Sequence, residues 1–321
     1  MGVNKSEFAL LCELKNKLSF QGRVLQLGRQ RVSMTFGTLK AILSSYSLPP
    51  YKPEAPLSVH GQPTDEVFFK ALGFSEVESL DAHGFEGATI VHDLNLPVPD
   101  EWKERYDFIY DGGTSEHVFN FPQCLKNIYD LLKPGGFIVH HVPTSNYVNH
   151  GFYSFNPIVF TEYYSANKFD LIDVFICEAP RNFHRANVYV YKYDAAQERR
   201  FDCFNHGLGL RRHVDTFVVA QKNEYSTKDV IPQQNAYQSV WQSVDNGAVR
   251  ASKPSLLARI CNKLKNILSP GQYQYAKRVY QCIMQRQYTF EHLFGIKPFL
   301  ACEVLISYLI KGRRPPLHGR Y

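Results

Sequence analysis

Residues 106–143 read YDFIYDGGTSEHVFNFPQCLKNIYDLLKPGGFIVHHVP, and this stretch carries the strongest indication of the fold. An apolar run ends at Asp111, a turn with the sequence Glu-His-Val follows, and residues 121–132 have helical character. The helix is expected to stop at Lys-Pro-Gly-Gly, because such a segment does not continue a helix. The run FIVHHV then predicts a second buried strand. A strand, a crossover helix and a strand in this order predict a parallel sheet.

The rest of the chain up to residue 222 continues this alternation. Expected helices cover residues 5–18, 33–46, 65–72 and 156 to about 167. Expected strands are residues 23–28, 76–80, 88–92 and 169–177, the strand-like NVYVYKY, and a last strand in HVDTFVVAQK. Three of the apolar runs are followed directly by an aspartate, namely Asp81, Asp93 and Asp111. The pattern therefore predicts an α/β domain with carboxylates at the strand ends.

Composition changes divide the chain further. Residues 1–224 form the expected α/β domain, in which residues 47–63 contain five prolines and predict an insertion without regular structure. Residues 225–252 predict a linker, and residues 253–321 predict a basic helical C-terminal region. From Arg250 onward 13 Lys or Arg face two acids, so the whole-chain charge of +6 leaves −5 for residues 1–249.

Composition also indicates which kind of protein the chain is and in which compartment it is expected. A hydrophobic fraction of 44% with 21% charged residues is typical of a soluble globular protein. The N-terminal segment lacks the apolar core of a signal peptide, and the seven cysteines include no Cys-x-x-Cys pair. We therefore expect a cytoplasmic protein without structural zinc or a disulfide framework.

The ordered motifs of residues 106–143 resemble those of the class I S-adenosylmethionine-dependent methyltransferases, in particular the group called type 11. That group combines a strand ending in Asp, a Glu-His-Val turn, a helix and Leu-Lys-Pro-Gly-Gly before the next strand. The resemblance extends over about residues 20–222. It implies a Rossmann-like sheet of seven strands, with the last strand inserted antiparallel, and S-adenosylmethionine as cofactor.

The resemblance also assigns cofactor-binding residues. Asp81 would accept hydrogen bonds from both ribose hydroxyls, and Asp93 with the backbone of Leu94 would meet the adenine edge. Asp111 and Gly112 would face the sulfonium and the substrate. This placement follows the rule that open α/β sheets bind ligands beyond the carboxyl ends of their strands.

The turn after the first strand departs from the family pattern. The family has Asp-x-Gly-x-Gly-x-Gly there, whereas QLGRQRV keeps only Gly28. The resemblance places Gly28 under the methionine portion of the cofactor. Because that portion carries a carboxylate, we expect the Arg29 guanidinium to bind it in place of the missing backbone amides.

Histidines and a polar aromatic loop are the candidates for chemistry on the acceptor. His117 and His141 are candidate proton acceptors, since an unperturbed imidazole has a pKa near 6.5. The loop after FIVHHV combines amides with aromatic rings and suits a sugar or another polar ring, although such aromatics also serve simply to cover a core. Its candidate substrate-binding residues are Asn146, Asn149, His150 and Tyr153. The histidine spacings match no metal signature, so the sequence predicts no metal site.

The leading hypothesis is methyl transfer to an O or N atom of a small polar acceptor, such as a sugar of a glycan precursor. The alternative is a methyltransferase-like protein without activity that serves as a binding or assembly module. A nicotinamide-dependent oxidoreductase is disfavoured, because no Gly-x-Gly-x-x-Gly follows a predicted strand.

The basic C-terminal region is expected to contact either a membrane surface or protein. Its apolar segment PFLACEVLISYLI is too short to span a bilayer, yet suits an interfacial helix next to Arg313 and Arg314. Packing on the body or on a partner protein is the competing interpretation. No nucleic-acid-binding module surrounds it, so no nucleic-acid partner is expected.

Overall fold

The computed structural model describes residues 2–52, 62–180, 188–193, 212–235, 237–238, 241–242 and 317–320. The chain divides into two units, of which Met1–Ala195, Arg212–Gln233 and Pro316–Tyr321 form the first. Most of the proline-rich insertion, the later part of the predicted linker and nearly all of the predicted helical region lie outside the described residues.

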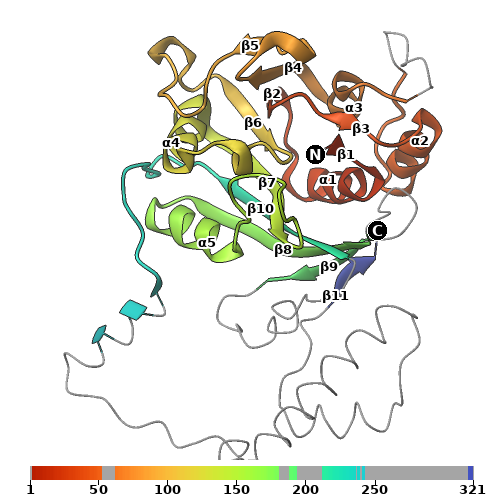
Figure 1. Cartoon of the computed structure of the whole chain (residues 1–321). Helices are drawn as coiled ribbons and strands as arrows, with labels where there is room; N and C mark the ends of the chain where they lie inside the picture. Colours follow the sequence, from red (N-terminus) through yellow and green to blue (C-terminus); the bar gives the residue numbers. More distant parts are fainter. Residues whose placement is uncertain are drawn as a thin grey trace, which may run out of the picture. The chain divides into compact units, whose positions relative to one another are not determined.

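The first unit has helices on both sides of a central sheet (Figure 1). Its α-helices are α1 (Lys5–Leu18), α2 (Phe36–Ser45), α3 (Asp65–Ala71), α4 (Phe121–Leu131) and α5 (Pro157–Ala166). Short 3-10 turns are η1 (Gly84–Glu86), η2 (Asp100–Trp102) and η3 (Ser115–His117). The strands are β1 (Gly2–Val3), β2 (Gly22–Leu27), β3 (Arg31–Val32), β4 (Phe74–Asp81), β5 (Ile90–Val91), β6 (Tyr106–Asp111), β7 (Leu132–Ser145), β8 (Asp170–Pro180), β9 (Tyr189–Lys192), β10 (Arg212–Gln221) and β11 (Leu317–Arg320).

The order of the strands confirms the predicted fold. The large sheet runs β11-β9-β8-β10-β7-β6-β2-β4-β5. Strands β5, β4, β2, β6 and β7 pair in parallel, whereas β10 lies antiparallel between β7 and β8. This is the seven-strand arrangement, with an antiparallel last strand, that the resemblance implied. Strands β9 and β11 extend the sheet beyond β8, and β11 comes from a segment that was predicted to be helical.

Alternation along the strands builds a separate core on each face of the sheet. On β10, Phe217 and Val219 pack in the cluster that holds the buried faces of α1, α2 and α3. Val218 and Ala220 point to the opposite cluster, with α4 and α5. Successive side chains of a strand point to opposite faces, so a run of apolar residues serves both clusters.

The structure corrects the predicted start of one helix, α2, and of one strand, β7. Helix α2 begins at Phe36 rather than Ser33, because Arg31 and Val32 pair with β1 and Thr35 caps the helix through a 3.1 Å bond from Thr38 N. Strand β7 begins at Leu132, and the Lys-Pro-Gly-Gly segment lies at an irregularity in its register with β6.

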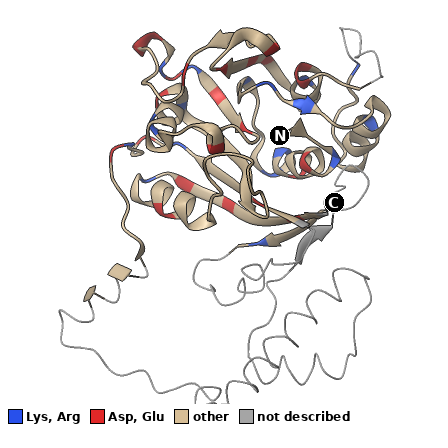
Figure 2. Cartoon of the chain, viewed as in Figure 1, with Lys and Arg blue, Asp and Glu red and all other residues tan. Residues whose placement is uncertain are grey.

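Positive and negative side chains are both present on the described part of the first unit. Basic and acidic residues occur on several helices and strands of the first unit (Figure 2). Among the described helices, none combines the length and apolarity needed to cross a membrane.

Candidate functional site

The carboxyl ends of β2, β4 and β6 meet at Gly28. Its backbone has φ +66°, and its N–H donates to Leu80 O at 2.7 Å. A Cβ built on Gly28 would lie 2.6 Å from Thr114 Oγ1 and 3.7 Å from Asp81 Oδ2. Glycine is therefore required at this position by both the conformation and the close approach. The predicted cofactor residues Gly28 and Asp81 are neighbours in space.

Asp81 and Asp93 both lie at this edge of the sheet. Asp81 is partly exposed and accepts one long bond, 3.4 Å, from His83 N. The exposed Asp93 accepts bonds from Asn95 N and Nδ2, which hold the pKa of its carboxyl below the usual range. Leu94 is buried in the core.

Arg29 already binds a carboxylate of the protein. Its Nε and one terminal nitrogen contact the two oxygens of the buried Asp65 at 2.7 and 2.8 Å, and its other terminal nitrogen donates to Gly87 O at 2.9 Å. The guanidinium thus ties the turn after β2 to the start of α3. Its predicted role toward a cofactor carboxylate stays a prediction, and that carboxylate would have to compete with Asp65.

The place of Asp111 facing the sulfonium and the substrate stays a prediction, and its side chain points into the protein. The carboxylate is fully buried, accepts bonds from Thr114 N and Ser115 N at 3.0 and 3.2 Å, and pairs with His140 Nδ1 at 2.7 Å. His140 Nε2 in turn lies 2.7 Å from Tyr164 Oη. Although burial favours the neutral form, the bond and charge of His140 keep the pKa of Asp111 below its usual range. The side chain serves an internal network because β6 and β7 place it beside His140.

Gly112 lies in a similarly crowded position. A Cβ there would come within 2.5 Å of the Tyr110 ring and 2.7 Å of Gln30 Oε1. Its backbone therefore packs directly against the turn after β2.

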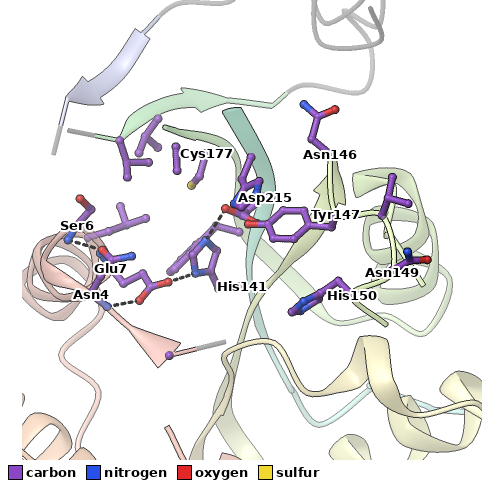
Figure 3. A pocket seen from close by; sticks show the side chains of 18 residues that line it. Asn4, Ser6, Glu7, His141, Asn146, Tyr147, Asn149, His150, Cys177 and Asp215 are labelled. Carbon is purple, nitrogen blue, oxygen red and sulfur yellow. Dashed lines mark hydrogen bonds and ion pairs between the residues drawn. The ribbon is translucent and has the colours of Figure 1, made fainter. Parts of the chain in front are cut away.

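A cavity of about 380 Å³ lies at the carboxyl end of β7 (Figure 3). It is lined by the start of α1, the loop after β7, and parts of β8, β9 and β10. The structure brings four of the predicted residues to this cavity: His141, Asn146, Asn149 and His150. Tyr153 does not line it, and its hydroxyl donates to Phe119 O at 2.7 Å. Asn146 and Asn149 have φ +69° and +64°, a conformation that asparagine tolerates, so the backbone alone favours these residues.

Figure 3 shows His141 between two carboxylates. Its Nδ1 pairs with Glu7 Oε1, and its Nε2 lies 3.8 Å from Asp215 Oδ2. Burial disfavours the charged ring, but Glu7, a bond to Cys177 and Asp215 together raise the pKa of His141 well above its usual range. Burial raises the pKa of Asp215 to about 6. Asp215 Oδ1 and His141 Nε2 have no hydrogen-bond partner among the described residues.

Glu7 and Asp215 are not among the site residues predicted from the sequence. A capping box at the start of α1 already accounts for an acid at position 7, so Glu7 gave no sign of a second role. Its Oε2 accepts a hydrogen bond from Asn4 N at 2.6 Å. Asp215 carried a usable signal, since it is an acid two residues before the apolar run Phe217–Ala220 of a predicted strand.

A second cluster joins η3 to the loop after β7. Glu116 Oε1 lies 3.2 Å from His150 Nε2 and 3.8 Å from His117 Nε2. Burial and then the charge of Asp111 raise the pKa of Glu116 to about 8, while burial lowers the pKa of His117. One potential ligand atom from each of the three side chains lies within 4.8 Å of the others. The prediction of no metal site considered spacing along the chain, which does not reveal groups brought together from separate segments.

Comparisons with known proteins concern the fold alone. No family model matches the chain, and no curated protein matches its sequence. Among solved structures, the chain is similar to a 1,6-didemethyltoxoflavin-N1-methyltransferase from Burkholderia thailandensis, at 15% identity and TM-score 0.37 over 68% of this chain and 80% of the other. It is also similar to the YcgJ protein of Bacillus subtilis, at 13% identity and TM-score 0.35 over 67% and 98% of the two chains. A methyltransferase from Archaeoglobus fulgidus matches at 14% identity and TM-score 0.33 over 66% and 93%. These values are too low to add to what the strand order establishes.

Proposed function

We propose that this chain is an S-adenosylmethionine-dependent methyltransferase whose acceptor binds in the cavity at the end of β7. The cofactor side of the proposal rests on Gly28 and Asp81. Asp81 accepts only one long bond among those found for its side chain, so its oxygens retain lone pairs for two ribose hydroxyls. The type 11 assignment rests on the ordered motifs of residues 106–143.

The observation that carries the acceptor side is a pair of buried polar atoms. Asp215 Oδ1 and His141 Nε2 belong to residues that line the cavity and have no hydrogen-bond partner among the described residues. Buried polar atoms without partners are costly, so they favour a ligand with hydroxyl or amine groups. The cavity lies at the carboxyl end of β7, the strand next to β6, and Gly28, which follows β2, and Asp81, which ends β4, lie at the same edge of the parallel sheet. A small polar acceptor, such as a sugar, matches this lining.

The charges assign roles within the cavity. The raised pKa of His141 favours its protonated ring, which has no lone pair for a further proton. We assign proton removal to Asp215, whose pKa of about 6 suits a base that works near neutral pH. His141 Nε2, 3.8 Å away, then balances the charge of the Asp215 carboxylate, and the hydroxyl of Tyr147 donates a hydrogen bond to it.

When bound, S-adenosylmethionine supplies the methyl group. The protein's own contribution is to hold the acceptor atom in line with the methyl carbon and to receive the acceptor's proton at Asp215. His117, with its lowered pKa and an exposed ring, was the other predicted proton acceptor; it does not line the cavity.

Calorimetric titration with S-adenosylhomocysteine tests the cofactor site. Wild type is expected to bind, and Asp81→Ala to weaken binding by about 1–3 kcal/mol, the cost of leaving hydroxyls without a charged acceptor. Glu101→Ala, which removes an exposed acid of η2, is the matched control and should bind as wild type does. Absence of binding to folded wild type at millimolar ligand would favour the inactive binding module instead.

Transfer of a labelled methyl group to a panel of sugars and amines tests the acceptor site. Asp215→Asn should lower the transfer rate by roughly 10²- to 10⁴-fold, the usual contribution of a general base. The same variant should keep its affinity for S-adenosylhomocysteine, because Asp215 belongs to the acceptor cavity. An undiminished transfer rate in Asp215→Asn would remove this residue from the mechanism.

A further inference from the structure

Glu116, His117 and His150 bring three metal-ligating groups together from two segments. Glu116 and His117 belong to η3, whereas His150 belongs to the loop after β7. The His150 and His117 Nε2 atoms lie 3.2 and 3.8 Å from Glu116 Oε1, and the three possible ligand atoms are within 4.8 Å of one another. An ion with bonds of about 2.0–2.2 Å holds neighbouring ligand atoms roughly 3–4 Å apart. Small side-chain adjustments therefore suffice to enclose one ion.

The carboxylate of Glu116 is incompletely satisfied. Its side chain is fully buried, and its Oε2 has no hydrogen-bond partner among the described residues. A buried carboxyl oxygen without a partner is costly, and coordination to a cation is one way to compensate it. The unpaired Glu116 Oε2 is a second observation, separate from the distances between the imidazoles and Glu116 Oε1, and it also favours a bound cation.

The backbone holds the two segments in register. Glu116 O accepts bonds from Phe152 N and Tyr153 N at 2.9 and 3.2 Å. A Cβ on Gly151 would lie 2.9 Å from Glu116 O, so glycine allows the loop to seat closely on η3. The loop therefore presents His150 to Glu116 through backbone contacts that do not depend on an ion. Pre-positioned ligands lower the cost of binding.

We propose that Glu116, His117 and His150 bind a divalent transition-metal ion, with zinc as the expected ion. Two imidazoles and a carboxylate suit zinc and its first-row neighbours, whereas magnesium and calcium prefer oxygen ligands. The His117 and His150 side chains are 46% and 29% exposed, which leaves the ion a path from solvent.

The proposed site has room for a ligand that is not a protein side chain. Three protein ligands leave at least one position open in a four-coordinate zinc site. His150 also lines the cavity at the end of β7, so the ion would border the compartment that holds Asp215 and His141. A water or an oxygen of a molecule in that cavity is the expected occupant of the open position. Ion binding itself does not depend on the proposed methyl transfer.

Full-length protein stripped with a chelator, and then dialysed free of it, provides the test. Calorimetric titration with Zn²⁺ should show one site per chain, and Co²⁺ should produce visible absorption from a nitrogen- and oxygen-ligated ion. His117→Ala, His150→Ala and Glu116→Gln should each weaken Zn²⁺ binding by at least about tenfold. His92→Ala is the matched control, because it removes a histidine outside the cluster, and it should bind as wild type does.

Three results would overturn the proposal: no Zn²⁺ binding by wild type at micromolar concentration, unchanged affinity in the double variant His117→Ala/His150→Ala, or Mg²⁺ binding as tight as Zn²⁺ binding. Circular dichroism of each variant separates loss of the ion site from loss of the fold, and Glu116→Gln keeps the size of the side chain. The titration with S-adenosylhomocysteine is scored separately, so failure of the metal site and failure of the proposed enzyme activity are distinguishable.

Discussion

At the scale of single residues, Asp111 and Arg29 use their charges within the protein. Asp111 is fully buried and bonded to His140, and Arg29 makes a two-pronged contact with the buried Asp65. Both residues lie where the family resemblance places cofactor ligands. Their substitution should therefore affect stability as well as any binding.

Asp111→Asn should lower the free energy of unfolding by about 1–3 kcal/mol at pH 7, because it removes a buried carboxylate that is hydrogen-bonded to His140. The sign of the pH dependence follows from the lowered pKa of Asp111 in the folded protein. The unfolded chain binds the proton more readily, so the stabilisation is complete above the ordinary value of 3.8 and is lost as pH falls through the folded pKa. Urea unfolding at pH 7 and pH 3 should show the difference between wild type and variant shrinking at low pH. An equal stability difference between wild type and Asp111→Asn at pH 7 and at pH 3 would contradict this prediction.

Arg29→Ala should lower stability by about 1–3 kcal/mol, because the buried Asp65 then loses its charged partner. Arg29→Lys keeps the charge but loses the two-pronged contact with Asp65. The stability of this variant should therefore lie between that of wild type and that of Arg29→Ala. If Arg29 also binds the cofactor carboxylate, the alanine variant should lose affinity for S-adenosylhomocysteine, while a decarboxylated analogue should bind wild type and variant about equally. Equal loss for both ligands would assign Arg29 to the Asp65 contact alone.

At the scale of an element, the first turn of α1 has two functions. Glu7 closes the capping box with one oxygen and pairs with His141 through the other. The helix thereby places a negative charge on the face of the sheet where the cavity lies. A single side chain links helix start and cavity.

Glu7→Gln separates these two functions. Glutamine also completes a capping box, so helical content by circular dichroism should not change. The loss of the Glu7 charge should lower the pKa of His141, which nuclear magnetic resonance of the ring protons measures by titration. Asp215, Cys177 and Tyr147 remain as the other titratable groups around the ring. An unchanged pKa of His141 would show that Glu7 does not control its charge.

At the scale of the whole molecule, the charge is divided unequally along the chain. Residues from Arg250 onward have 13 basic against two acidic side chains, yet Leu317–Arg320 within this stretch returns to the sheet as β11. Among the described strands, β11 pairs with β9 alone at the sheet edge, so its removal leaves the other described pairings intact.

Removal of residues 250–321 should therefore abolish sedimentation with anionic vesicles while the α/β unit stays folded. The full chain should bind such vesicles at low salt and release them as salt rises, because the attraction is electrostatic. Neutral vesicles are the control for the lipid, and Arg313→Gln with Arg314→Gln should give an intermediate effect. If the full chain ignores anionic vesicles at low salt, a partner protein or packing is the better explanation of the basic region.

The sequence by itself determined the parallel α/β order, the positions of most helices and the carboxylates at the strand ends. Those properties depend on local periodicity, caps and breakers, as in α1, where Asn4 and Glu7 define the start of the helix. The resemblance added the antiparallel insertion of the last strand, which β10 confirms. The short strand β3 escaped detection because its pairing partner, β1, lies far away in the sequence.

Only the tertiary structure decided which chemical groups share a site. Glu7, His141 and Asp215 come from a helix and two strands, whereas Glu116 comes from η3 and His150 from the loop after β7. Their charges depend on burial and on neighbours distant in sequence, so His141 has a raised pKa whereas His117 has a lowered one. Periodicity predicts which face of the sheet a side chain occupies, but the pairing of strands and the seating of loops decide what it meets there.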